Sequence, residues 1–113
     1  MSACIFCEIV AGKIPATVVL ETEHVLAFRD ISPQAPTHVL VIPREHHDNL
    51  TSLVTHNPDL AAKVFTAASD AAVLEGLEGG YRVVSNIGDD GGQTVDHMHL
   101  HVLGGRSLTW PPG

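Results

Sequence analysis

The sequence predicts an α+β domain, in which a five-stranded antiparallel sheet carries one long and one short helix on one face. Five short apolar segments are bounded by turn residues, as strands usually are. Residues 57–80 instead repeat their apolar positions with the period of a helix. Hairpin segments mixed with one long and one short helix are typical of the α+β class.

The first part of the chain predicts a short helix and a hairpin. Residues 4–15, CIFCEIVAGKIP, space their apolar side chains as a helix does, before a glycine and a proline interrupt the pattern. Residues 17–21 and 25–29 read as two strands around a tight turn at residues 22–23.

A buried strand and the long helix come next. After the loop SPQAPTH, the nearly continuous apolar run of residues 38–43 predicts a central strand. Asn57 is suited to cap the helix that follows, and either Gly76 or the pair at 79–80 ends it. Its predicted apolar stripe comprises Leu60, Val64, Ala67, Ala68, Ala71 and Leu74.

The remainder predicts two strands and the loop between them. Residues 81–88, YRVVSNIG, form the fourth strand, and residues 97–105, HMHLHVLGG, the fifth. Between them lies the glycine-rich loop 89–96, DDGGQTVD, and SLTWPPG follows as a tail. A chain of this length suits a single domain, 1–113, with one core.

Composition excludes some partners. Six Lys and Arg against thirteen Asp and Glu give a formal charge of −7, which argues against nucleic acid binding through phosphate contacts. No segment approaches the ~20 apolar residues of a membrane span, and the first ten residues lack an export signal's basic region and long apolar run. We therefore expect a cytoplasmic protein with no membrane or nucleic acid partner.

Three histidines alternate with apolar residues in the fifth strand. His97, His99 and His101 share one face of a strand, about 6.6 Å apart, while Met98 and Leu100 point to the other. Such a row can surround a metal or a phosphate. Two chemistries are open: a catalytic zinc that activates water, or an imidazole that attacks phosphorus and is later released by water.

The glycine-rich loop precedes these histidines. Its glycines let the backbone approach a ligand, and successive N–H groups can bind an anion. An ordinary turn would use the same residues, so the loop points to a phosphate site only because three aligned histidines follow it.

The only two cysteines, Cys4 and Cys7, are spaced Cys-x-x-Cys. In a reducing compartment this spacing indicates a metal half-site or a redox pair rather than a structural disulfide. The motif lacks the strand before it that a thioredoxin-like pair would have. Zinc is the functional interpretation, and two buried thiols are the alternative.

HMHLHVL matches the histidine-triad motif, His-φ-His-φ-His-φ-φ with φ apolar, at every position. From IFCEIVAGKIPA through AFRDISPQAPTHVLVIP and YRVVSNIGDDGGQTVDHMHLHVLGG to WPPG, the chain resembles the histidine triad (HIT) nucleotide-binding proteins, in their nucleoside phosphoramidase branch. The resemblance covers nearly all 113 residues. It implies a HIT-like fold whose sheets join across a homodimer.

The resemblance also implies an activity. The family releases a nucleoside 5′-monophosphate from a leaving group through a nucleotidyl-histidine intermediate. We expect hydrolysis of purine nucleoside 5′-phosphoramidates of the AMP–amine type, with aminoacyl-adenylates as further candidates. A dinucleoside polyphosphate hydrolase and a nucleotide-binding scaffold with incidental turnover are the alternatives. By position, His99 is the nucleophile, His101 contacts the phosphate and leaving group, and His97 supports the nucleophile through its neighbouring backbone.

A nucleotide site follows by the same resemblance. Asp30 binds the ribose hydroxyls, although the same residue can simply cap a turn. Trp110 lies in the segment that reaches the partner's site, or is a loose tail residue. The positions around the α-phosphate are Asn86, Gly92, Gln93 and Thr94, the last where serine is common. The base slot, which would look the same as plain core, comprises Ile5, Phe6, Ile9, Phe28 and Ile31.

Some bacterial histidine-triad proteins carry Cys-x-x-Cys and bind zinc with two histidines, which map onto His46 and His97. The resemblance therefore implies a closed, structural Cys₂His₂ site of Cys4, Cys7, His46 and His97. A zinc-bound His97 cannot also be a free catalytic base. His47 is an alternative to His46, but it points to the opposite face if the strand persists.

Overall fold

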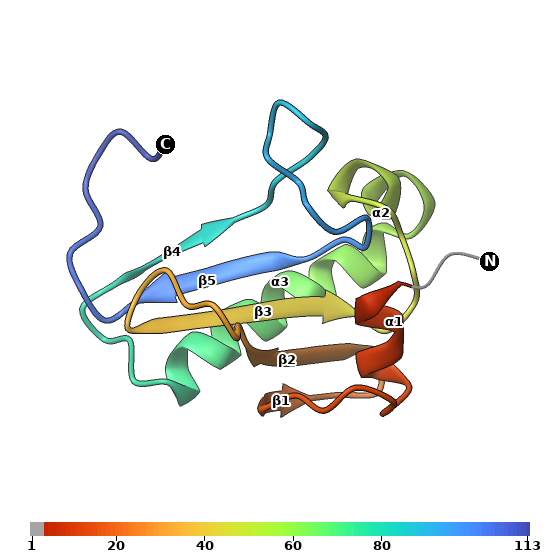
Figure 1. Cartoon of the computed structure of the whole chain (residues 1–113), viewed down its shortest axis with the longest axis horizontal. Coiled ribbons are helices and arrows are strands. Elements are labelled where there is room, and N and C mark those ends of the chain that lie inside the picture. The colour runs from red at the N-terminus through yellow and green to blue at the C-terminus, as the bar shows by residue number, and fades with distance from the viewer. Residues whose placement is uncertain (1–3) are drawn as a thin grey trace.

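A five-stranded antiparallel sheet forms the centre of the molecule in the computed structural model, which describes residues 4–113 (Figure 1). Its order is β1-β2-β3-β5-β4, so the predicted fold class is confirmed and β3 is central. The strands are β1 (Val18–Glu21), β2 (Val25–Arg29), β3 (Thr37–Pro43), β4 (Tyr81–Val84) and β5 (Leu100–Gly104).

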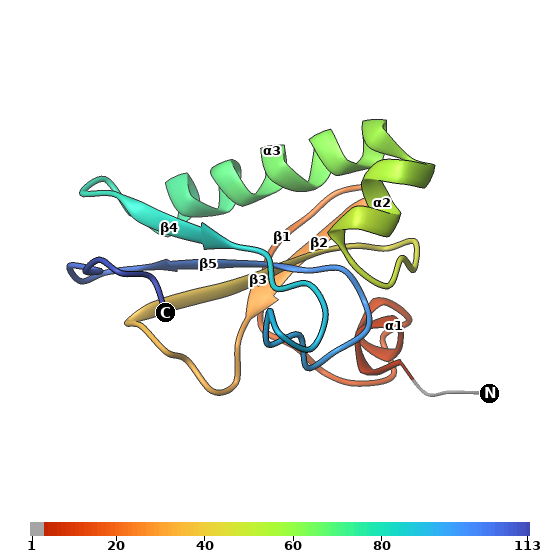
Figure 2. The ribbon, with the colours of Figure 1, turned by 90° about the horizontal axis from the view of Figure 1, so that it is seen from above.

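Helices cover both faces of this sheet. The short helix α1 (Ile5–Val10) lies on one side, and α2 (Leu50–His56) and α3 (Pro58–Leu74) lie on the other (Figure 2). The prediction that the helices share one face is therefore wrong. Residues 38–43 of β3 are all buried, so both faces of this strand need apolar cover.

Two apolar clusters fill these layers. Under α3, the larger cluster combines helix residues such as Val64 with Val39 of β3 and Leu100 of β5. Under α1, the smaller cluster contains Phe6, Leu26, Phe28, Leu40 and Ile42. In the described residues, no helix is long and apolar enough to cross a membrane.

The long helix begins as predicted and buries a slightly different stripe. The Asn57 side chain accepts a hydrogen bond from the Leu60 N–H at 3.2 Å, and Gly76 follows the helix with φ 71°. Leu74 is 60% exposed, so its assignment to the stripe is wrong. Ala72 is buried in its place, and Leu77 packs against the core after the turn.

The fifth strand is shorter than the predicted 97–105, and the fourth is shorter than the predicted 81–88. Pro43, at the end of β3, has no N–H to donate. The Met98 N–H instead donates to the His47 carbonyl at 2.6 Å. The predicted alternation persists nevertheless: Met98 and Leu100 belong to the cluster under α3, whereas His97 and His99 contact Phe6 on the α1 side.

Candidate active site

A cavity of about 290 Å³ opens on the α1 face of the sheet. Its walls combine α1, the end of β2, the loop before β5 and two histidines of the triad. Residues predicted for the nucleotide site that line it are Ile5, Phe6, Ile9, Phe28, Asp30, Ile31, Thr94, His99 and His101. Residues that the sequence analysis missed are Ile14, Pro15, Ala16, Arg29, Leu40 and Val95.

The apolar end of the cavity is both core and binding surface. Phe6 and Phe28 are nearly fully buried and meet edge to face, with ring centroids 5.7 Å apart. Ile31 is 97% exposed and Ile5 is 47% exposed, so these two form the rim. Leu40 could have been predicted from the alternation of side chains along β3. It is paired with Phe28 in the strand register, so the two side chains lie on the same face of the sheet.

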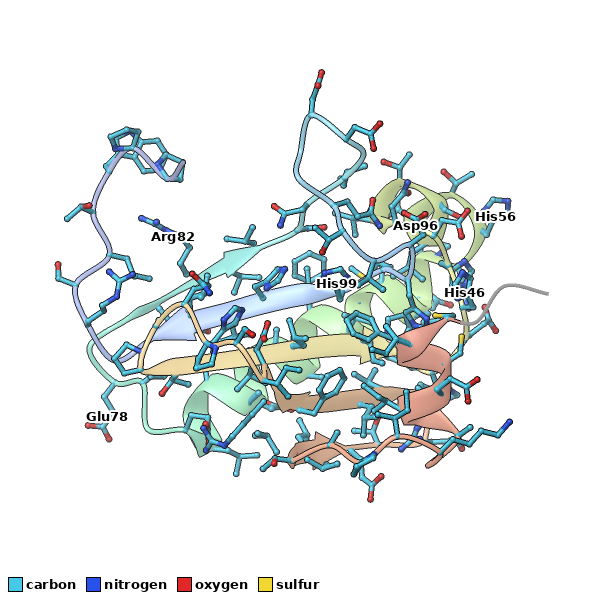
Figure 3. The ribbon with its side chains drawn as sticks, viewed as in Figure 1. His46, His56, Glu78, Arg82, Asp96 and His99 are labelled. Atoms are coloured by element: carbon cyan, nitrogen blue, oxygen red, sulfur yellow. The ribbon has the colours of Figure 1, made fainter. Side chains whose placement is uncertain are left out.

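His99 has its ring fixed by the backbone. Its Nδ1 lies 2.7 Å from the His97 carbonyl oxygen, an acceptor, so Nδ1 carries the proton. Nε2 therefore keeps its lone pair. Phe6 packs edge-on against the ring at 5.1 Å and limits its rotation. Figure 3 shows His99 over the sheet. With its ring fixed and Nε2 unprotonated, His99 can act as a nucleophile or as a ligand.

His101 receives its tautomer from His38, a residue that the sequence analysis missed. The Gln34 N–H donates to His38 Nδ1 at 3.0 Å, so Nε2 of His38 carries the proton. That Nε2 lies 2.9 Å from His101 Nδ1 and donates to it. In neutral His101, Nε2 must then carry the hydrogen. His38 was detectable because it alternates with Leu40 in β3, which places both on one face.

Burial keeps these imidazoles neutral. Burial, together with the neighbouring His99 and His38, lowers the pKa of His101 to about 4. Burial also lowers the pKa of His38, against the opposing effect of Asp30. At neutral pH, His101 is therefore an uncharged donor through Nε2.

Asp30 serves two purposes at once. Its Oδ1 accepts from the Ser32 N–H at 2.8 Å, which is the turn cap given as the alternative role. Its Oδ2 lies 3.5 Å from His38 Nε2, and the residue lines the cavity. The cap therefore fixes the carboxylate at the cavity wall and does not exclude ligand binding there.

The glycine-rich loop 89–96 supplies Thr94 and Val95 to the cavity wall. Asn86, Gly92 and Gln93, which were also predicted for the nucleotide site, are not among the described residues that line the cavity. The Gln93 amide nitrogen donates to the Asp48 and Val95 carbonyls, and its oxygen accepts from the Gly88 N–H. Gln93 thus braces the loop. Trp110 is 81% exposed.

The four predicted metal ligands come together beside this cavity. Cys4 Sγ lies 3.3 Å from His97 Nδ1, and Cys7 Sγ lies 3.3 Å from His46 Nδ1. All four candidate ligand atoms are within 4.8 Å of one another. Figure 3 shows His46 near α1. His47 is absent from this described group and instead bonds Glu45 through Nε2.

The four candidate ligand side chains suit zinc. His97 Nε2 donates to the Pro43 carbonyl at 2.8 Å, and His46 Nε2 lies 3.0 Å from Asp48 Oδ1. Both Nδ1 lone pairs therefore face the thiols, with outer partners that hold the rings. Burial, together with Cys4 and Glu8, raises the pKa of Cys7 to about 11. The Cys7 thiol therefore stays protonated unless a bound cation displaces its proton. Two sulfurs with two nitrogens match tetrahedral zinc.

A second group, Asp30, His38 and His101, is equally close-packed. It does not suit a metal. A metal on His38 Nε2 would require a hydrogen on Nδ1, where the Gln34 N–H already points. We interpret these three residues as a hydrogen-bonded chain.

Comparison with known proteins agrees with this geometry. The HIT domain profile matches residues 11–108, and the chain belongs to the HIT family. It is 50% identical to a 14 kDa zinc-binding protein of Zea mays, covering 99% of this chain and 89% of that protein. It is 45% identical to the adenylylsulfatase HINT1 of Arabidopsis thaliana, covering 99% and 78%.

Solved structures share the fold. A HIT family hydrolase from Legionella pneumophila superposes with a TM-score of 0.93 at 52% identity, covering 98% of this chain and all of that one. The chain is thus a homologue of HIT family hydrolases, and a zinc-binding protein is among its relatives.

Proposed function

We propose that this protein hydrolyses purine nucleoside 5′-phosphoramidates of the AMP–amine type, through the single HIT domain that we assign to residues 1–113. The observation that carries the proposal is the arrangement of His99. Its ring is held by the His97 carbonyl with Nε2 unprotonated, and it lines a cavity that also offers an apolar slot and the Asp30 carboxylate. The apolar slot suits the base, the Asp30 carboxylate suits the ribose hydroxyls, and His99 lies where the phosphate would bind.

In this mechanism, Nε2 of His99 attacks phosphorus and the phosphorus–nitrogen bond breaks. The leaving nitrogen takes up a proton from solvent and departs as an amine, and hydrolysis of the intermediate by water later returns a proton to solvent. The His101 Nε2–H donates a hydrogen bond to the group that gains negative charge, and Thr94 offers a hydroxyl nearby. Water then attacks the nucleotidyl-histidine and releases the monophosphate. The His97 carbonyl favours the positive charge that His99 acquires in the intermediate.

Adenylylsulfate is the second candidate substrate, because a relative that is 45% identical carries the name adenylylsulfatase. The same attack on phosphorus would then expel sulfate. Dinucleoside polyphosphates and aminoacyl-adenylates would present the same α-phosphate with other leaving groups. The leaving group lies beyond the described walls for base and ribose, so the nucleotide site suits all of these substrates.

A comparison of substrates tests the proposal. AMP release from an AMP–amine conjugate, its GMP counterpart, adenylylsulfate and a diadenosine polyphosphate is measured with the wild type and with His99→Gly. We expect kcat/KM to be highest for the phosphoramidates and His99→Gly to release no AMP. A higher value for adenylylsulfate would transfer the proposal to that substrate. Tight AMP binding with no release above His99→Gly would indicate a scaffold.

We also propose that Cys4, Cys7, His46 and His97 bind a structural zinc ion. A closed set of four ligands leaves no position for a reacting water. The chemistry therefore belongs to His99, while His97 has a structural side chain and a backbone carbonyl that orients the nucleophile.

A further inference from the structure

His97 joins the metal site to the nucleophile. Its side chain is fully buried, with Nδ1 3.3 Å from Cys4 Sγ and 3.5 Å from Cys7 Sγ. Its carbonyl oxygen holds His99 Nδ1 at 2.7 Å. One backbone unit thus carries a metal ligand on its side chain and the acceptor that fixes the attacking ring.

Helix α1 makes a second connection between the two sites. It has six residues, too few for a helix to be stable on its own. Cys4 caps it by accepting from the Cys7 N–H, and Ile5, Phe6 and Ile9 from the same helix line the cavity. Phe6 packs edge-on against both His97 and His99. Bound zinc would pin this helix to the sheet through His46 and His97.

We propose that the Cys4–Cys7 pair is a thiol switch on the hydrolase: oxidation to a disulfide expels zinc, releases α1 from the sheet and lowers turnover. The inference rests on the proposed zinc site and the proposed hydrolase. Cys4 and Cys7 are partly exposed, so a small hydroperoxide can reach them. They are the only cysteines in the chain.

The redox step balances with a hydroperoxide as the oxidant. One thiolate attacks the peroxide oxygen, giving a sulfenic acid and an alcohol, or water from hydrogen peroxide. The second sulfur displaces hydroxide from the sulfenic acid, which leaves as water once protonated, and the disulfide forms. Two sulfurs lose two electrons, the peroxide gains them, and Zn²⁺ leaves with its charge unchanged.

The product no longer links α1 to the sheet. A Cys-x-x-Cys disulfide closes only within the first turn of the helix, whereas zinc bridges that turn to His46 and His97. Without the ion, His97 loses its partner on Nδ1 and the base slot loses its pinned wall. His99 should be positioned less well for attack, which lowers kcat, and the nucleotide should bind more weakly, which raises KM.

The experiment treats zinc-loaded wild type with hydrogen peroxide and follows four quantities. A chromogenic chelator measures zinc release, and mass spectrometry detects the loss of two hydrogens. Amide hydrogen exchange measures the protection of residues 5–10, and AMP release measures turnover. We expect zinc release, lost protection and a fall in kcat/KM of at least about tenfold, the range seen when partners of metal ligands are removed. Dithiothreitol with added zinc should restore all four.

Two arms separate metal loss from chemical damage. Chelation of zinc from the reduced protein should reproduce the exchange and turnover changes without a disulfide. Cys4→Asp, which keeps an oxygen ligand but cannot form the disulfide, should keep its zinc and its own starting rate under peroxide.

The outcomes are distinguishable. Zinc release with unchanged exchange and unchanged kcat/KM overturns the switch while leaving the zinc site intact. Protein that never binds zinc overturns the zinc site, and with it the switch. A zinc-loaded protein that releases no AMP overturns the hydrolase. An equal loss of turnover in peroxide-treated Cys4→Asp shows that the disulfide is not the cause, and overturns the switch.

Discussion

Each histidine of the site has its tautomer set by the group bonded to its other ring nitrogen. The His97 carbonyl puts the proton of His99 on Nδ1, and the Gln34 N–H puts that of His38 on Nε2. The sequence pattern places the triad on one face, but it contains nothing about tautomers. These depend on a backbone carbonyl, and on a loop N–H that the fold brings to His38.

His38 is predicted to be a positioning residue for His101. His38→Leu should lower kcat at least about tenfold, because His101 Nδ1 loses its donor and Nε2 no longer has to carry the hydrogen. His38→Gln, whose amide can still donate, should recover part of the rate. The measurement is single-turnover AMP release, with nitrogen NMR of His101 to report its tautomer.

The matched control is His24→Leu, since the His24 side chain is exposed and pairs with Glu23, away from the cavity. It should leave the rate unchanged. An unaltered tautomer of His101 in His38→Leu would contradict the assignment, as would equal rates in the Leu and Gln variants.

Asp30 is predicted to select ribose over 2′-deoxyribose. Hydrogen bonds to a charged group contribute about 1.5–3 kcal/mol, so wild-type kcat/KM should favour the ribonucleotide by at least about tenfold. Asp30→Ala should lose this preference. Measuring both sugars with each variant separates recognition from general damage, because a lost turn cap would slow both substrates alike. The same sugar ratio in the wild type and in Asp30→Ala would remove ribose binding from Asp30.

At the scale of elements, zinc is predicted to hold α1 in place. Protein purified without chelator should contain about one zinc per chain, and Cys4→Ser should lower Tm by several degrees, since metal binding contributes folding free energy. Glu8→Ser on the same helix is the control, because Glu8 is not one of the four candidate zinc ligands and its side chain forms a 3.9 Å ion pair with Lys13. Less than about one-tenth zinc per chain, with unchanged Tm in Cys4→Ser, would return Cys4 and Cys7 to two plain thiols.

The elements that sequence could predict are those with long or repeated apolar patterns, such as β3 and α3. Helix α2 was missed because only Leu53 of its residues is fully buried, which is too weak a period to detect. The shortened β5 follows from pairing beside Pro43, a tertiary effect. The nucleotide site was predicted from the family resemblance. Residue spacing alone could not predict that the Gln93 side chain bonds the Asp48 carbonyl.

At the scale of the whole molecule, the depressed pKa of His101 predicts acid lability. Its pKa is 6.5 in the unfolded chain and about 4 when folded. Between these two pH values, His101 is protonated in the unfolded chain but not in the folded protein. The free energy of unfolding therefore falls as pH drops through this window. Tm near the lower limit should be at least about 5 °C below that at pH 7.

His101→Gln is the variant that isolates this effect, since it has no titrating ring, whereas zinc release in acid affects both proteins equally. The pH dependence of Tm should be shallower in His101→Gln than in the wild type. Parallel curves for the two proteins would show that His101 does not contribute.

The sheet edge at β4 predicts a homodimer. Within residues 4–113, the strand order leaves one edge of β4 unpaired, and its Tyr81 and Val83 are 42% and 38% exposed. Strand β1, the other edge, has an irregular register between Val18 and Leu20, a feature that discourages pairing. β4, by contrast, pairs with β5 in a regular register over residues 81–84. Two copies pairing through β4 would extend the sheet and cover these apolar side chains.

Sedimentation at micromolar concentration should therefore give twice the 12.0 kDa chain mass. Val83→Lys places a charge at the proposed interface and should give monomers, because an unpaired charge is costly in a buried contact. Val54→Lys on α2, where the native side chain is 49% exposed, is the matched control and should remain a dimer. A monomeric wild type would contradict the prediction. A dimer unaffected by Val83→Lys would instead move the interface away from β4, toward another exposed apolar surface such as that around Trp110, which is 81% exposed.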